Sequence, residues 1–442
     1  MSDEPLFLAN ITAGYYTFIT FDNESSVSIM EKTNKGMRLH IAIFGRRNVG
    51  KSSVLNALTG QSVSIVSAQA GTTTDPVEKA MEMLPLGPVL FIDTAGIDDV
   101  GDLGRLRIKK TMSVFERADL ALLVIEGREW GSYEEELYGE LKQRAVPSVI
   151  VINKVDEIEP EAGVLEAIRA KGEEPVLVSA LTGQGIDELR QRIIKAAPEE
   201  AVNLPSIMGD LLPPGELAVL VVPIDLEAPK GRLILPQVQA IRDALDSDAY
   251  VMVVKERELR SALDRLKTPP ALVVTDSQAF LKVAADTPPE VPMTSFSILF
   301  ARFKGDLAEM VRGAMTIDKL HPGDRVLVCE ACTHHPIGDD IGRVKIPRWL
   351  TQYVGGKLHF DHFQGQDFPE NIRDYKLIIH CGACMWNRRA MLSRIIRARQ
   401  CGVPITNYGL TIAYSLGIFE RALQPFPQAL EVYREERNIR LH

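Results

Sequence analysis

The chain has 442 residues, and this length suggests about three domains. Its composition, 45% hydrophobic and 25% charged, is typical of soluble globular proteins. We find no apolar run long enough to span a membrane and no secretion signal at the N-terminus, so we expect a cytoplasmic protein without a membrane segment. The net charge of −9 argues against a broad nucleic-acid-binding surface, and no nucleic-acid partner is expected.

The cysteines are confined to one part of the chain. None occurs in the first 328 residues, and all five follow within one C-terminal stretch, as Cys329, Cys332, Cys381, Cys384 and Cys401. Clustered cysteines in a large cytoplasmic chain are more typical of metal ligands or redox groups than of a disulfide framework.

Residues 1–37 form a polar lead-in that we expect to be mobile and that could reflect an upstream choice of start codon. Residues 38–198 then alternate apolar strands with amphipathic helices. This alternation predicts a parallel sheet covered by helices on both faces. The expected strands are Leu39–Phe44, Val89–Asp93, Leu120–Ile125, Ser148–Asn153 and Val176–Ser179, and the clearest helices are Tyr133–Arg144 and Asp187–Ala196.

Two further α/β units follow. Residues 209–297 predict strands at Ala218–Pro223, Tyr250–Val254 and Ala271–Thr275, with helices through Gln237–Leu245 and Glu256–Leu266. A unit of about 80 residues gains stability by burying a face against a copy of itself, so we interpret it as a dimerisation domain and expect a homodimer. Residues 298–442 predict helices at Ala308–Leu320, Val344–Val354, Arg388–Arg399 and Thr411–Ala422, with strands at Arg325–Val328 and Leu377–Ile379.

A phosphate-binding motif lies between the first strand and the first helix. The segment Gly45–Ser52, GRRNVGKS, matches G-x-x-x-x-G-K-[ST] in the required context. Backbone N–H groups at the start of the helix would cradle the phosphates, Lys51 would reach the β- and γ-phosphates, and Ser52 would hold Mg²⁺. The expected phosphate-binding residues are Gly45, Asn48, Val49, Gly50, Lys51, Ser52 and Ser53.

Four downstream motifs occur in the order that a guanine nucleotide site needs. Asp93–Gly96, DTAG, would place a carboxylate beside the metal and a glycine amide near the γ-phosphate. In Asn153–Asp156, NKVD, which includes Lys154, the carboxylate of Asp156 can accept from guanine N1 and N2. At Ser179–Leu181 the amide of Ala180 or a neighbour can reach guanine O6, and in Gly71–Pro76 a threonine, Thr73, can complete the Mg²⁺ shell.

These motifs together resemble the small GTPases, and the GRRNVGKSS and GTTTD forms resemble the TrmE/Era branch. The resemblance implies a GTP hydrolase in which Lys51, Thr73 and Asp93 are catalytic. Ile97 follows the DTAG glycine where other GTPases carry a catalytic glutamine, so slow intrinsic hydrolysis is expected. Asn48 matches an asparagine that helps to bind K⁺ in potassium-activated members, although it could equally be a turn-forming residue.

A second constellation lies in the C-terminal unit. Cys332 and His334 follow one predicted strand, and His380, Cys381 and Cys384 follow another. Strand ends of this kind face a common crevice in an open α/β sheet. The set could supply the four ligands of a zinc site or three thiolates of an iron–sulfur cluster, and the ligand chemistry alone does not choose between them.

A C-x-H motif followed after about 45 residues by H-C-x-x-C, downstream of such a GTPase domain, resembles the [FeFe]-hydrogenase maturation GTPases of the HydF family. The segments CTHHPIGDDIGRVKIPRWL, KLIIHCGACMWNRRAM and PITNYGLTIAYSLG also resemble that family. The resemblance implies that Cys332, Cys381 and Cys384 hold a [4Fe-4S] cluster. His334 or His380 would be the fourth ligand or a close neighbour, with His335, Asp339 and Asp340 as weaker candidates.

The same resemblance implies a carrier. It would receive a di-iron precursor from radical-SAM maturases and deliver it to apo-[FeFe]-hydrogenase, with GTP acting as a conformational switch. Two alternatives remain open: an RNA-interacting or ribosome-assembly GTPase, and a GTPase with a structural zinc domain. We interpret Cys329 and Cys401 as packing residues, and His359 and His362 as surface or turn residues.

Overall fold

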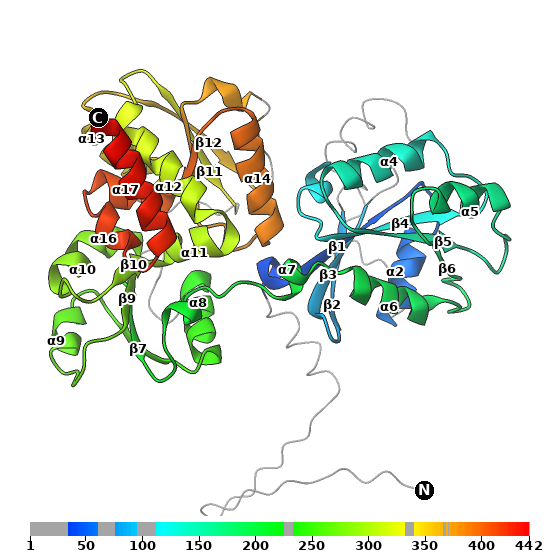
Figure 1. Ribbon diagram of the computed structural model, residues 1–442, viewed down its shortest axis with the longest axis horizontal. Helices are drawn as coiled ribbons and strands as arrows, with labels where there is room; N and C mark the ends of the chain where they lie inside the picture. Colours follow the sequence, from blue (N-terminus) through cyan, green and yellow to red (C-terminus); the bar gives the residue numbers. More distant parts are fainter. Residues whose placement is uncertain are drawn as a thin grey trace, which may run out of the picture.

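The computed structural model describes residues 34–60, 76–94, 112–224, 233–331, 340–365, 368–369 and 371–441. The chain forms two lobes, a GTPase-like lobe and a C-terminal lobe, joined through the segment around α7 (Glu199–Val202) (Figure 1). Among the described helices, none combines the length and the apolar character needed to cross a bilayer.

The first lobe is built on a six-stranded sheet of order β2-β3-β1-β4-β5-β6, in which only β2 is antiparallel. Apolar clusters fill both faces of the sheet, as the continuous apolar strands predicted. The strands are β1 Leu39–Phe44, β2 Val77–Met83, β3 Gly87–Asp93, β4 Leu120–Glu126, β5 Ser148–Asn153 and β6 Val176–Leu177, and the helices are α2 Lys51–Thr59, α4 Ser132–Gln143, α5 Ala162–Arg169 and α6 Ile186–Ala196.

Strand β2 was not predicted, because its sequence VEKAMEM is half polar and the strand is largely exposed at the sheet edge. The predicted strand Val176–Ser179 is shorter in the structure and ends at Leu177. The α/β class and the parallel sheet are confirmed.

The second sheet is parallel, with the order β10-β9-β7-β8. It consists of β7 Leu217–Val221, β8 Tyr250–Val254, β9 Leu272–Thr275 and β10 Met293–Ser295, with helices α8 Leu235–Asp246, α9 Leu259–Leu263 and α10 Phe280–Asp286. Strand β10 has only three residues, and it and α10 were not predicted from the sequence.

The third sheet is also parallel, with the order β12-β11-β13-β14. Its elements are β11 Arg325–Glu330, β12 His359–Gln364, β13 Leu377–His380 and β14 Ile405–Asn407, with helices α11 Phe296–Lys304, α12 Leu307–Met315, α13 Ile346–Val354, α14 Arg388–Gln400, α15 Tyr408–Ser415, α16 Phe419–Leu423 and α17 Pro427–Leu441. The prediction of one helix over Thr411–Ala422 is wrong, because Gly417 adopts a left-handed φ of 73° and separates α15 from α16. His359 and His362 lie within β12 rather than in a turn.

The second and third sheets share one hydrophobic core, which runs from Ile207 to Ala429. Helix α11 explains the continuity, since Phe296, Ile298, Leu299 and Phe300 are all buried. The two sheets therefore pack together in one body, the C-terminal lobe.

The last residues of the lead-in contact the C-terminal lobe. Asn34 caps a 3-10 turn at Lys35–Met37, and the Lys304 Nζ donates to the Gly36 carbonyl at 2.7 Å. A Cβ on Gly36 would lie 2.4 Å from the Trp386 carbonyl oxygen, so the backbone of the lead-in touches that of the C-terminal lobe here. The predicted mobility of the lead-in stays a prediction, since residues 34–37 make these contacts and residues 1–33 lie outside the described part of the chain.

Candidate nucleotide and metal sites

The phosphate loop connects β1 to α2, and its backbone has the conformation that the motif requires. Asn48 and Gly50 both have left-handed φ angles, 65° and 88°. A Cβ on Gly45 would lie 2.1 Å from the Val124 carbonyl oxygen, and one on Gly50 would lie 2.3 Å from the Asn153 side-chain nitrogen. These two positions therefore accept only glycine.

Lys51 is buried at the start of α2. Its Nζ donates to the carbonyl oxygens of Gly45 and Arg46 at 2.8 and 2.7 Å. The ammonium group thus lies across the mouth of the loop, where incoming phosphates would meet it together with the N–H groups that begin the helix. Val49 is buried beneath the loop, whereas Ser52 and Ser53 are exposed.

Asp93 and Ser52 form the part of the site that fits Mg²⁺. The Ser52 hydroxyl donates to Asp93 Oδ2 at 2.5 Å, while Asp93 Oδ1 is buried and has no hydrogen-bond partner among the described residues. Burial raises the pKa of Asp93 above its usual range, against the opposing effects of Ser52 and Lys51. A divalent cation would supply the missing partner, since carboxylate and hydroxyl oxygens are ligands that Mg²⁺ prefers.

Asn153 ties the base-binding motifs to the phosphate loop. Its Nδ2 donates to the Val49 carbonyl at 3.0 Å, and its Oδ1 accepts from the Ala180 amide at 3.0 Å. Lys154 has a φ of 65° and pairs with Glu126. Ser179 Oγ accepts from the Thr182 amide at 3.0 Å, and Asp156 is exposed beyond the end of β5. The structure thus brings together the predicted phosphate and base residues that it describes.

Several predicted site residues lie outside the described residues. In the nucleotide site these are Thr73, Gly96 and Ile97; in the cysteine site they are Cys332, His334, His335 and Asp339. Their predicted roles stay predictions.

Cys381 and Cys384 follow the carboxyl end of β13. The Cys381 amide donates to the Cys329 carbonyl at 2.8 Å, and Cys381 Sγ accepts from the Ala331 amide at 3.1 Å. Ala331 ends the described part of the β11 segment and directly precedes Cys332 in the chain. Between the two cysteines Ala383 has a left-handed φ of 49°, which marks a tight turn. Both thiols are partly buried, and their side chains have further partners.

His380 is fully buried, and both of its ring nitrogens are engaged. Nε2 lies 2.9 Å from an Arg394 guanidinium nitrogen, and Nδ1 lies 2.9 Å from the Cys381 carbonyl oxygen. Because a guanidinium only donates and a carbonyl only accepts, Nδ1 carries the proton. Burial, with the Arg394 charge, lowers the pKa of His380 to about 3. In this arrangement neither ring nitrogen is open to a metal ion, because ligation through Nε2 would displace Arg394.

Cys329 is fully buried in β11, and burial raises the pKa of its thiol to about 12. It is therefore a neutral core residue. Cys401 ends α14 as its C-cap, and Asp340 caps the turn before α13 by accepting from the Arg343 amide. Within the described residues, we find no group of three or more His, Cys, Asp or Glu side chains arranged to hold a metal ion.

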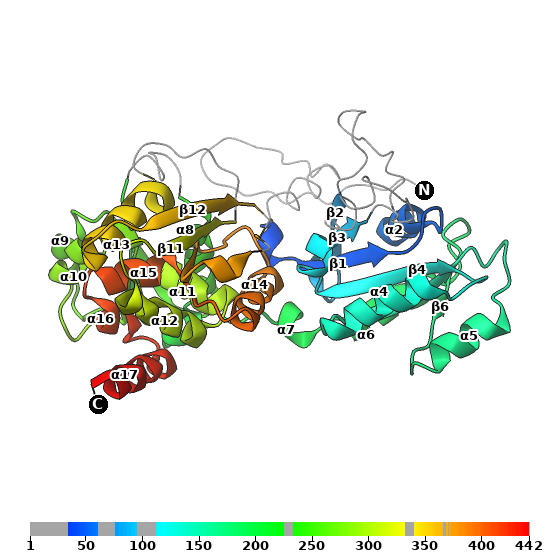
Figure 2. The same cartoon turned by 90° about the horizontal axis from the view of Figure 1, so that it is seen from above.

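Residues 381–387, between β13 and α14, form the cysteine loop. The sequence did not reveal that this loop is docked on the GTPase-like lobe. Asn387, which caps α14, donates from Nδ2 to the Arg117 carbonyl at 2.8 Å and to Asp119 Oδ2 at 3.0 Å. The Ser393 hydroxyl donates to the Glu116 carbonyl at 2.9 Å. Figures 1 and 2 show α14 on the side of the C-terminal lobe that faces β1 and β3.

The loop itself is held from the lead-in. Asn34 Nδ2 donates to the Cys384 carbonyl at 2.8 Å. An asparagine directly before a helical pattern could have suggested a helix cap at Asn387, but nothing local to the sequence indicates its partners 270 and 268 residues away.

Comparison with known families assigns all three parts of the chain. Residues 40–154 match the family described as 50S ribosome-binding GTPase. Residues 207–305 match the hydrogen maturase F dimerization domain, and residues 308–425 match the hydrogen maturase F tetramerization domain.

Curated GTPases match between 36% and 41% of the chain. The chain is 39% identical to the tRNA modification GTPase MnmE of Chromobacterium violaceum over 158 residues, which are 36% of this chain and 34% of that protein. It is 37% identical to GTPase Era of Aquifex aeolicus, over 41% of this chain and 64% of that protein. The chain therefore spans between about a third and two-thirds of the length of these relatives.

Among solved structures, Aquifex aeolicus Era matches with 24% identity and a TM-score of 0.32, covering 56% of this chain and 99% of that one. The G domain of the T. maritima FeoB iron transporter matches with 24% identity and a TM-score of 0.30, covering 36% of this chain and 99% of that one. With a GTPase domain followed by both hydrogen maturase F domains, the chain belongs to the hydrogen maturase F (HydF) type of GTPases.

Proposed function

We propose that this chain is a GTP-switched carrier in [FeFe]-hydrogenase maturation, which holds a [4Fe-4S] cluster on Cys332, Cys381 and Cys384 and delivers a di-iron precursor to apo-hydrogenase. The observation that carries the proposal is the cysteine loop itself. In a HydF-type chain, two thiols follow the end of β13, and Cys381 accepts a backbone N–H from the residue that precedes Cys332.

The surroundings of the loop suit an anionic thiolate cluster. Lys304 is buried, and it interacts electrostatically with Cys384; desolvation nevertheless lowers its pKa to about 7. Arg394 is also buried and interacts electrostatically with Cys381. Nearby cations and backbone N–H groups stabilise negatively charged sulfur. A cluster with only three cysteine ligands supplies one iron whose remaining ligand can be exchanged.

GTP would act through the contact between the lobes. The segment Met112–Arg117 lies on the chain after the DTAG motif, and its Glu116 and Arg117 carbonyls accept hydrogen bonds from Ser393 and Asn387 of α14. A γ-phosphate orders switch segments in GTPases, and hydrolysis releases them. A movement of Met112–Arg117 would therefore act directly on the helix that follows Cys384.

The second sheet offers an edge for dimerisation. Strand β8 lies at the end of the sheet order, and its Tyr250 and Val253 are 64% and 44% exposed. Exposed apolar edge strands pair readily with another chain. We therefore expect Val253→Lys to convert a dimer into a monomer in light scattering, whereas Leu281→Lys, on exposed α10 of the same sheet unit, leaves the dimer intact.

To test the carrier function, the radical-SAM maturases load the chain with the di-iron precursor. The loaded chain is then mixed with apo-[FeFe]-hydrogenase. Hydrogen evolution should appear with the wild-type chain and fail with Cys381→Ala, while Cys401→Ala serves as the matched control. A chain that binds zinc in place of iron, or that associates with RNA or ribosomes and not with the hydrogenase, would contradict the proposal and favour one of the two alternatives.

A further inference from the structure

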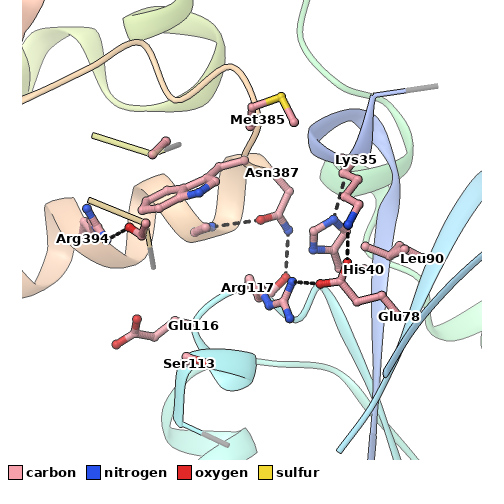
Figure 3. Close-up of a pocket in the computed structure, with 14 residues that line it drawn as sticks. Lys35, His40, Glu78, Leu90, Ser113, Glu116, Arg117, Met385, Asn387 and Arg394 are labelled. Atoms are coloured by element: carbon pink, nitrogen blue, oxygen red, sulfur yellow. Dashed lines mark hydrogen bonds and ion pairs between the residues drawn. The ribbon is translucent and has the colours of Figure 1, made fainter. Parts of the chain in front are cut away.

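A cavity of about 420 Å³ lies between the two lobes, next to the cysteine loop (Figure 3). Its volume falls within the range of about 300 to 1,000 Å³ that is usual for small-molecule sites. The C-terminal lobe contributes Ala331, Met385, Trp386, Asn387 and Arg394 to its lining, and the GTPase-like lobe and lead-in contribute Lys35, His40, Glu78, Glu116 and Arg117.

One end of the cavity adjoins the proposed cluster ligands. Ala331, a lining residue, donates its amide to Cys381 Sγ at 3.1 Å. Met385 and Trp386, also in the lining, directly follow Cys384. A ligand in the cavity would therefore lie beside the cysteine loop while touching both lobes.

The lining carries more positive than negative charge. Lys35, Arg117 and Arg394 are cationic, whereas Glu78 and Glu116 are the carboxylates of the lining. Glu78 is paired with both Lys35 and Arg117, at 2.7 and 2.6 Å. Although burial opposes ionisation of Glu78, these two hydrogen bonds lower its pKa below the usual range.

Two buried polar atoms of the lining have no hydrogen-bond partner among the described residues. Arg117 is 8% exposed, and its Nε has no hydrogen-bond acceptor within the described chain. His40 is 4% exposed, and its Nδ1 is likewise unpaired there, while its Nε2 lies 3.0 Å from the Lys35 carbonyl oxygen. A buried donor without an acceptor costs about 1 to 3 kcal/mol. An acceptor supplied by a ligand would remove this cost for the Arg117 Nε–H.

Apolar side chains complete the lining. This part of the lining offers apolar surface to the apolar groups of a ligand, and it consists of Leu90, Met385, Trp386 and Ala390. The cavity as a whole therefore suits a compact anion that combines hydrogen-bond acceptors with apolar groups. A metal fragment bearing cyanide and carbonyl ligands has both properties, because the cyanide nitrogen accepts hydrogen bonds and carbonyl ligands are weakly polar.

We propose that this interlobe cavity is the cargo site, and that the GTPase-like lobe itself contributes to it, with Arg117 Nε donating to an anionic ligand of the di-iron unit. The inference rests on the proposed carrier function. It adds the position of the cargo and the contribution of the GTPase-like lobe to binding it. Opening the contact between the lobes would remove Arg117 from the cargo and so favour its release.

The test uses the full chain carrying its reconstituted cluster and, as the probe, a synthetic di-iron dithiolate complex with two cyanide and four carbonyl ligands. Binding is measured by titration and by the infrared bands of the complex that remain after desalting. Arg117→Lys keeps the cation but removes the Nε–H, and Ala390→Leu fills part of the cavity without changing its charge. Arg169→Lys makes the same change at an arginine that pairs with Glu174 outside the cavity lining, and it is the matched control.

We expect Arg117→Lys to weaken binding about tenfold or more, since hydrogen bonds to charged groups are worth about 1.5 to 3 kcal/mol. Ala390→Leu should also weaken binding, and Arg169→Lys should stay within about twofold of the wild type. Unchanged GTP hydrolysis confirms that each variant is folded, because neither Arg117 nor Ala390 belongs to the nucleotide site.

The outcomes separate this inference from the function on which it rests. Retention of the complex by the wild type and equally by Arg117→Lys and Ala390→Leu would overturn the cavity as the cargo site while leaving the carrier function standing. Failure of the wild type itself to bind the complex would overturn the carrier function.

Discussion

The two ends of the central sheet in the GTPase-like lobe differ in what their sequences reveal. At the carboxyl end, Lys51, Asp93 and Asn153 belong to motifs that predict their own roles, and their contacts lie within the lobe. At the amino end, His40, Arg117 and Asp119 belong to no motif, yet the cysteine loop docks there. Figure 2 shows these ends pointing away from and toward the C-terminal lobe. Residues for nucleotide chemistry can thus be recognised from local motifs, whereas the contacts between the lobes join residues that are far apart in the sequence.

The largest effect is expected at the carboxyl end. Lys51→Ala removes the cation that would meet the β- and γ-phosphates, and should lower GTP hydrolysis on the order of 10²-fold. Iron content after reconstitution should be unchanged, because Lys51 bonds to the phosphate loop and acts on Asp93, both in the GTPase-like lobe. Lys195→Ala, on the exposed side of α6, is the control. Full hydrolysis by Lys51→Ala would break the assignment of this end to nucleotide chemistry.

A smaller effect is expected at the amino end. Asn387→Ala removes the hydrogen bonds to Arg117 and Asp119 together with a helix cap, and should destabilise the fold by about 1 to 3 kcal/mol. Denaturant unfolding measures this cost, with Asn371→Ala, whose side chain bonds only to Asp374 in the same lobe, as the control.

The same variant separates GTP hydrolysis from the effect of GTP on the cluster. GTP hydrolysis should persist in Asn387→Ala, while any response of the cluster EPR signal to GTP should be lost. A response that survives in full would show that the coupling does not pass through this contact.

The smallest effect concerns pH. Burial lowers the pKa of His40 below its usual 6.5, although Asp119 and Glu78 act in the opposite direction and Arg117 in the same one. A base whose folded pKa is lowered contributes stability that is present above about pH 6.5 and lost as the pH falls.

His40→Gln should therefore flatten the decline in thermal stability between about pH 7 and 5. The exposed His321, replaced by glutamine, is the control. An unchanged pH profile in His40→Gln would mean that His40 is not held in its neutral form at this interface.

Much of the architecture could be predicted because apolar strands buried on both faces have a clear signal. Leu39–Phe44 and Ser148–Asn153 match the structure in both bounds. Edge strands gave no such signal: β2 is half polar, and β12 carries HFDHFQ with no buried residue. The shared core of the second and third sheets depends on α11, which is buried because it packs between the two sheets. The hydrophobic pattern of α11 alone did not indicate this position.

The candidate sites follow the same rule. Gly45, Gly50 and Lys51 were predictable because the phosphate loop is a local motif with fixed stereochemistry. The pairing of Asn387 with Asp119 was not, since it joins residues 268 positions apart. His380 was predicted as a ligand or a neighbour of the cluster, and only the fold shows that Arg394 occupies its Nε2.

The proposed carrier function depends above all on an iron–sulfur cluster held by the cysteine loop. Anaerobic reconstitution followed by iron, sulfide and EPR analysis of the wild type, Cys381→Ala and Cys329→Ala tests it most directly. We predict about four irons per chain and a reduced-state EPR signal in the wild type and in Cys329→Ala, and the loss of both in Cys381→Ala. Zinc in place of iron, or a cluster that persists in Cys381→Ala, would contradict the account.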